Sequence, residues 1–141
     1  MGQYYKVVNI TKKEFISPWT FDDGAKLVEF GASGEGTMFA LAALLSDGNG
    51  RGGGDIMSDN NNDNSLIGSW AGDKIVISGD YADDNFLTRE EKRALKKSVG
   101  KDNVNLYHAV HLQELGFIDI SDKIIENIKR AGEKIGERIS E

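Results

Sequence analysis

The chain has no cysteine among its 141 residues, which excludes disulfide bonds and thiolate metal sites. It has no apolar run near the roughly 20 residues that span a bilayer, and no signal-peptide pattern opens it. N-myristoylation is excluded as well, because Lys6 stands where that pattern requires Ser or Thr. We therefore expect a cytoplasmic protein that makes no membrane contact.

Basic side chains are outnumbered, 17 against 23 acidic ones, and the formal net charge is −6. Residues 1–87 carry 6 basic and 13 acidic side chains, whereas residues 88–141 carry 11 basic and 10 acidic ones. Because affinity for duplex nucleic acid comes largely from Lys and Arg that neutralise phosphates, the acidic front half argues against such a partner. It fits a cation site, a face that docks on a basic partner, or an ordinary solvated surface.

The hydrophobic pattern predicts one domain, residues 1–141, of the α+β class, with a small, mainly antiparallel sheet, one buried helix and a helical C-terminal part. The almost wholly apolar segment Thr37–Leu45 predicts the buried helix within an acidic, Gly- and Asp-rich α+β part, residues 1–87. Four strands are expected, at Tyr4–Ile10, Glu14–Ile16, Lys26–Phe30 and Asp73–Ser78.

Three helices are expected in the remaining part, residues 88–141. Thr88 is a suitable cap for a first helix that runs to about Val99, with acidic residues in its first turn. A second helix is expected over Asn105–Leu115, and a third begins at Ser121. A glycine follows each of the first two helices and predicts their ends.

The segment 47–64 is dominated by Gly, Asp and Asn, which favour loops over helices or strands. Its carboxylate and amide oxygens are ligands that calcium prefers, but their spacing does not match an EF-hand. A surface loop without a metal is the alternative. The candidate ligands for a divalent cation such as calcium are Asp47, Asn49, Asp55, Asp59 and Asp63, with Asp83 from a later turn.

A glycine-rich stretch lies between a predicted strand and the predicted buried helix. A strand, a glycine turn and a helix start often cradle phosphates, because free N–H groups point at the anion. The lysine of a P-loop is missing and Glu35 adds a negative charge, which argues against nucleoside triphosphate hydrolysis. A small anion or nucleotide monophosphate is the candidate ligand, and a tight structural turn is the alternative. The candidate binding residues are Gly31, Ser33, Gly36 and Thr37.

Asp80, Tyr81 and Asp83 directly follow the clearest predicted strand. Carboxylates at the carboxyl end of a strand are common acid–base groups or metal ligands, although a solvated turn has the same composition. Trp70, just upstream, is a candidate wall for the base or sugar of a ligand, and a core position is its alternative.

His108 and His111, the only two histidines, share one face of a predicted helix. With Glu114 one turn further they are a candidate zinc site, although the His-Glu-x-x-His spacing is not met. Two ordinary half-buried histidines are the alternative.

Several motifs resemble those of one protein family. The opening MGQYYKVVN and the stretches SPWTFDDGAKLVEFG, DGNGRGGGD and GSWAGDKIVISGDYAD resemble a family of small, uncharacterised proteins of bacteria and their phages. The resemblance covers roughly residues 1–84, and LYHAVHLQELGFIDIS is similar more loosely. It implies an accessory phage or mobile-element protein, located in the host cytoplasm if phage-encoded, and it implies no catalytic residue.

No catalytic spacing is complete in the chain, so the favoured hypothesis is a non-enzymatic binding protein. Its partner would be a host protein or a small anionic ligand, a nucleotide among the candidates, and binding would counter host defence. One alternative is a divalent-metal-dependent hydrolase built on Asp47, Asp55, Asp80 and Asp83. Another is a structural subunit of a phage particle. The sequence leaves the oligomeric state open.

Overall fold

The structure, a computed structural model, describes residues 3–32, 36–47 and 66–129. The α+β class is confirmed. The strands are β1 (Tyr5–Asn9), β2 (Glu14–Ile16), β3 (Ile75–Gly79) and β4 (Ile118–Asp119). The helices are α1 (Leu27–Phe30), α2 (Thr37–Leu45), α3 (Arg89–Val99) and α4 (Leu106–Ala109), and residues 121–129 are also helical.

The four strands form one sheet in the order β3-β1-β2-β4. The central strand β1 pairs antiparallel with β2 and β3, whereas β2 pairs in parallel with β4. In the β1–β3 register Lys6 lies opposite Ser78, and Val7 lies opposite Ile77. Because successive side chains of a strand point to opposite faces, Lys6 and Val7 face different layers.

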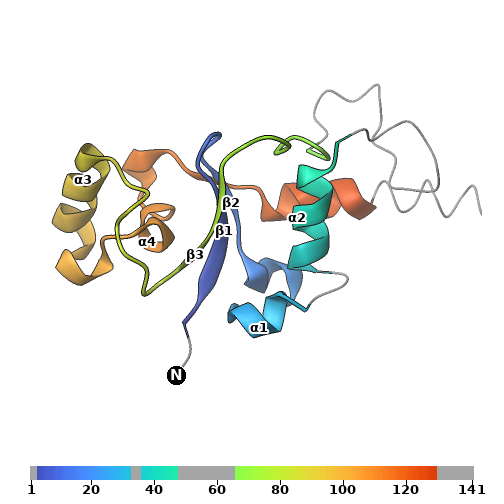
Figure 1. Cartoon of the computed structure of the whole chain (residues 1–141), viewed down its shortest axis with the longest axis horizontal. Coiled ribbons are helices and arrows are strands. Elements are labelled where there is room, and N and C mark those ends of the chain that lie inside the picture. Colours follow the sequence, from blue (N-terminus) through green and yellow to red (C-terminus); the bar gives the residue numbers. More distant parts are fainter. Residues whose placement is uncertain (1–2, 33–35, 48–65, 130–141) are drawn as a thin grey trace, which may run out of the picture.

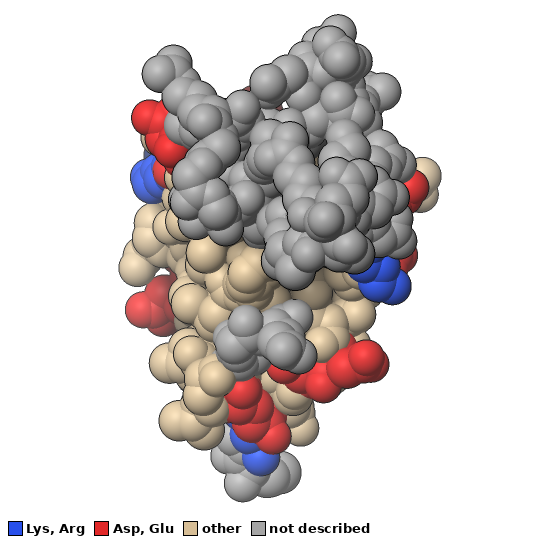
Figure 2. All heavy atoms as spheres, turned by 90° about the vertical axis from the view of Figure 1, so that its right-hand side faces the viewer, with Lys and Arg blue, Asp and Glu red and all other residues tan. Residues whose placement is uncertain are grey.

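Helices cover both faces of the sheet, so the molecule has three layers (Figure 1). On the side that we call the α2 side, α1, α2 and residues 121–129 enclose a core that contains Val7 and Trp70. On the opposite side, the α4 side, α3 and α4 enclose a second core that contains Val8 and Leu95. Seen from the α2 side, the described surface is uncharged over a broad area, with more acidic than basic patches around it (Figure 2).

The prediction of a strand at Lys26–Phe30 is wrong, because this segment contains the one-turn helix α1. The Glu29 carboxylate accepts a hydrogen bond from the Lys26 N–H at 3.1 Å, and the Gly31 N–H donates to the Leu27 carbonyl at 2.8 Å. These two bonds close a helical turn that the apolar pair Leu27 and Val28 does not predict.

Over its described residues, 88–129, the C-terminal part is less helical than predicted. Helix α3 follows the expectation, since Thr88 caps it and Gly100, with a φ of 90°, ends it. The predicted helix Asn105–Leu115 contains only α4, then a bend and a short 3₁₀ turn. This bent path lets Val110 and Leu112 both pack on the α4-side core. In the described part of the chain, no helix is both long and apolar enough to cross a membrane.

Candidate functional site

The glycine-rich stretch before α2 does not follow a strand. Gly31 ends α1 and Thr37 begins α2, while Ser33 lies outside the described residues. The Asp23 carboxylate accepts hydrogen bonds from the Thr37 N–H at 2.8 Å and from its Oγ1 hydroxyl at 2.7 Å. A Cβ at Gly36 would collide with the same carboxylate. The start of α2 is thus satisfied by an internal anion, which corrects the interpretation as a strand–turn–helix phosphate cradle.

Trp70 is a core residue. Its side chain is fully buried on the α2 side, and its indole Nε1 donates a hydrogen bond to Glu14 Oε1 at 2.8 Å. A buried ring whose N–H is already paired presents no face to a ligand. The core alternative is therefore confirmed, and the predicted role as the wall of a ligand site is corrected.

Most of the candidate calcium ligands lie outside the described residues. Only Asp47, an exposed residue just after α2, belongs to the part of the loop that the structure describes. Among the described residues, no three or more His, Asp or Glu side chains are arranged to hold a metal ion. The zinc hypothesis for the two histidines is therefore wrong, whereas the loop site stays a prediction. The candidates outside the described residues are Asn49, Asp55, Asp59 and Asp63.

Asp80 and Tyr81 lie at the end of β3, and they extend its pairing with the start of the chain. The Asp80 carboxylate accepts a hydrogen bond from the Tyr4 N–H at 3.0 Å. The Tyr81 N–H donates to Gln3 Oε1 at 3.3 Å, while the Tyr81 side chain is 66% exposed. Asp80 therefore has a structural partner, and Tyr81 presents its ring to solvent.

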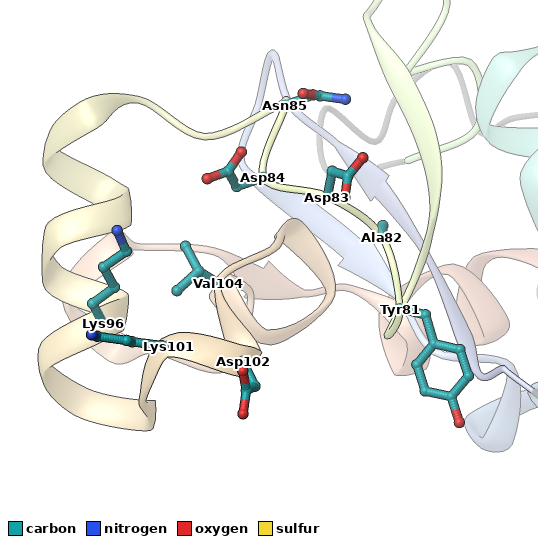
Figure 3. Close-up of a pocket in the computed structure, with 9 residues that line it drawn as sticks. All are labelled: Tyr81, Ala82, Asp83, Asp84, Asn85, Lys96, Lys101, Asp102 and Val104. Carbon is teal, nitrogen blue, oxygen red and sulfur yellow. The ribbon is translucent and has the colours of Figure 1, made fainter.

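A hollow of about 580 Å³ adjoins this turn (Figure 3). Asp83 and Asp84 line it from the turn, whereas Lys96 and Lys101 line it from α3 and the segment after it. The Tyr81 ring points away from the acidic side chains. Exposed carboxylates and ammonium groups of mixed sign select no single class of ligand, so the solvated-turn alternative fits this hollow best.

A second hollow, of about 600 Å³, lies between the start of α3, the β1–β2 turn and the segment before β4. We call it the acid-rimmed groove. Its apolar lining consists of Ile10, Phe86, Ala94, Leu115 and Phe117. Its polar lining consists of Lys13, Thr88, Glu90, Glu91 and Glu114.

The acid-rimmed groove already holds one ammonium group of the chain itself. The Lys13 Nζ donates to the Leu115 carbonyl at 3.1 Å and lies 4.0 Å from Glu91 Oε2. It also lies 5.7 Å from the centre of the Phe117 ring. A carbonyl, a carboxylate and an aromatic face are the groups that recognise an amino cation. The Lys13 side chain is still 51% exposed, so its position in the groove is open to solvent.

Lys6 on β1 is a functional candidate that sequence reasoning missed. The residue is only 3% exposed, and its Nζ lies 3.5 Å from the centre of the Tyr107 ring. Burial lowers the pKa of Lys6 from 10.5 to about 8, although Asp119 and Asp80 act in the opposite direction. The alternation of the strand could have predicted its burial. Lys6 shares a face of β1 with the buried Val8, and an apolar residue is expected there.

Both histidines lie on the α4 side near Lys6. Burial, followed by the positive charge of Lys6, lowers the pKa of His108 and of His111 below 6.5. The His111 ring packs edge-on against Phe15, and the His108 ring against Tyr107. Perturbed titratable groups that gather in one place are a recognised mark of functional sites.

Comparison with protein-family models, with curated proteins and with solved structures finds no match to this chain. The resemblance to bacterial and phage proteins therefore stays a prediction.

Proposed function

We propose that this protein is a non-enzymatic accessory protein that binds a basic segment of a partner protein in the acid-rimmed groove. The observation that carries the proposal is the position of Lys13, whose ammonium contacts Leu115, Glu91 and Phe117. A Lys or Arg side chain of a partner could replace Lys13 and make the same contacts.

The remaining lining suits such a partner. Phe86 is 43% exposed and offers an aromatic anchor of the kind that dominates binding energies at interfaces. Glu90 and Glu114 are exposed and would attract a basic segment over a distance. A hollow of about 600 Å³ accommodates a few side chains, which fits a short segment.

The nature of the partner rests on the resemblance. Similarity to proteins of bacteria and their phages supports a host protein as the target, a role against host defence and an action in the host cytoplasm. The hydrolase alternative needs converging carboxylates. The described residues contain no such cluster, and Asp55, one of its four candidates, lies outside them, so this alternative stays a prediction.

Isothermal titration calorimetry at low salt tests the groove. The probe is an amidated peptide with one phenylalanine flanked by two lysines, and we expect saturable binding to the wild-type protein. Phe86→Ala should weaken binding by about tenfold or more, since it removes the aromatic anchor. Phe39→Ala is the matched control, because Phe39 is also exposed, at 37%, but belongs to α2 on the other side of the sheet. Binding that is absent, or equally weakened by both variants, would overturn the proposal.

A further inference from the structure

The backbone of Lys13 is fixed independently of its side chain. Lys13 lies in the turn between β1 and β2, and its φ of 55° is in the left-handed region that lysine rarely adopts. Two hydrogen bonds fix this turn. The Lys12 N–H donates to Asn9 Oδ1 at 2.8 Å, and the Lys13 carbonyl accepts the Ile118 N–H at 3.0 Å. Because neither bond involves the ammonium, the side chain can leave the acid-rimmed groove while the turn keeps its conformation.

The groove surrounds one ammonium position, which is formed by the Leu115 carbonyl, Glu91 Oε2 and the Phe117 ring. Its carboxylate is firmly held, since the Glu91 side chain is only 14% exposed and its Oε1 accepts the Thr88 N–H at 2.8 Å. The Lys13 side chain, by contrast, is 51% exposed. A long ion pair of an exposed side chain contributes little to stability. The ammonium position is therefore a formed site with a replaceable occupant.

The neighbouring Lys12 has no part in the groove. Its ammonium pairs with the Asp73 carboxylate, which also accepts a hydrogen bond from Asn9 Nδ2 at 2.8 Å. The Lys12 side chain is 41% exposed and does not line the hollow, whereas Lys13 does. The two lysines thus match in charge and closely in exposure, but Lys13 occupies the ammonium position and Lys12 does not.

We propose that Lys13 is an internal competitor, which occupies the ammonium position until a Lys or Arg of the partner protein displaces it. This inference rests on the proposed function. Two cations in the same position would repel each other, so the apparent affinity for the partner is reduced to the fraction of molecules in which Lys13 has left. A partner that offers a cation alone gains little, because one ammonium replaces another. The groove therefore selects partners that add further contacts, such as an aromatic side chain against Phe86.

Isothermal titration calorimetry at low salt, with the same amidated lysine–phenylalanine peptide, tests the competition. Lys13→Met should bind the peptide about five- to tenfold more tightly than Lys12→Met, as expected if Lys13 fills the position in about 80–90% of molecules. Lys12→Met is the matched control. Both substitutions remove one positive charge from the same turn, so they change the long-range attraction of a basic peptide alike.

Lys13→Gly is a second variant that keeps the test decisive if Lys13→Met does not fold. Glycine adopts a φ of 55° freely, so this substitution removes the ammonium without straining the turn. It should show the same gain in affinity over Lys12→Met.

The outcomes separate this inference from the proposed function. Equal affinities of the Lys13 and Lys12 variants, or weaker binding by the Lys13 variants, would overturn the competition. The proposed function would survive that result if the wild type still bound the peptide and Phe86→Ala still weakened binding. Absence of binding by the wild type and by all variants would overturn both.

Discussion

The two faces of the sheet are built from alternate residues of the same strands, yet they differ in chemistry. On the α2 side, Val7, Ile16 and Trp70 belong to an apolar core. The buried Asn9 shares this face of β1, and it is hydrogen-bonded to the Asp73 carboxylate and to the Lys12 N–H. On the α4 side, the same central strand contributes Val8 and also Lys6, a buried charge. Helix α4 and the turn after it add both histidines of the chain, and the acid-rimmed groove lies on the same side.

We infer that this difference separates a side that serves only the fold from a side that also serves binding. An apolar core gains stability from burial alone, so the α2 side needs no ligand to explain its composition. A buried ammonium and two histidines of lowered pKa reduce stability, which is usual where a protein retains groups for function. We infer that the α4 side is the functional side.

The largest expected effect concerns the α2 side. Trp70→Ala should lower the free energy of unfolding by about 3–5 kcal/mol, because it leaves a large cavity in the core. It also leaves the half-buried Glu14 carboxylate without its indole donor. Urea denaturation measures the change.

The second tryptophan supplies the control for that measurement. Trp19 is 53% exposed, so Trp19→Ala should change the free energy of unfolding by less than about 1 kcal/mol. Equal effects of the two substitutions would show that Trp70 does not anchor the α2-side core.

The next effect is a dependence of stability on pH that arises on the α4 side. Folding lowers the pKa of Lys6 to about 8, so between that pH and 10.5 the unfolded chain binds more protons than the folded chain. The free energy of unfolding should therefore rise between pH 8 and pH 10, by about 2 kcal/mol. This expected rise ends near pH 10. Folding raises the pKa of Tyr107, so at higher pH the folded chain binds more protons than the unfolded chain at this residue, and the free energy of unfolding falls.

Lys6→Met provides the comparison for this pH profile. It should flatten the rise, since methionine does not titrate, and at neutral pH it should be neutral or stabilising. A wild-type profile that matches that of Lys6→Met would show that Lys6 titrates normally and is not buried as a charge.

The smallest effect concerns the helix that forms one wall of the acid-rimmed groove. Thr88 caps α3 through its hydroxyl, which accepts the Glu91 N–H at 3.1 Å, and the Glu91 carboxylate accepts the Thr88 N–H at 2.8 Å. Thr88→Ala should lower the free energy of unfolding by about 1 kcal/mol in thermal or urea denaturation. Ser98→Ala, at an exposed position of the same helix, should change it by less than about 0.5 kcal/mol.

Local patterns predicted much of the fold. The strands β1, β2 and β3 and the helices α2 and α3 followed from periodicity and caps. The one-turn helix α1 and the two-residue strand β4 did not, because such short elements carry no periodic signal. Their positions depend on single contacts, such as the hydrogen bond from the Lys26 N–H to the Glu29 carboxylate.

The candidate sites were less predictable than the fold. The groove combines Lys13, Phe86 and Leu115, which are distant in sequence and meet only in the folded chain. The anion partner of α2, Asp23, lies 14 residues before Thr37 and forms no recognisable motif with it. Lys6 differs from these residues, because its position among alternating apolar residues could have predicted from the sequence that it is buried.

The central claim, that binding belongs to the α4 side, is tested most directly by following backbone amide signals in NMR during titration with the lysine–phenylalanine peptide. We predict saturable shifts at Lys13, Phe86 and Leu115 of the acid-rimmed groove, while Leu41 and Leu44 of α2 stay unchanged. Shifts confined to α2, or spread evenly over both faces of the sheet, would contradict the account.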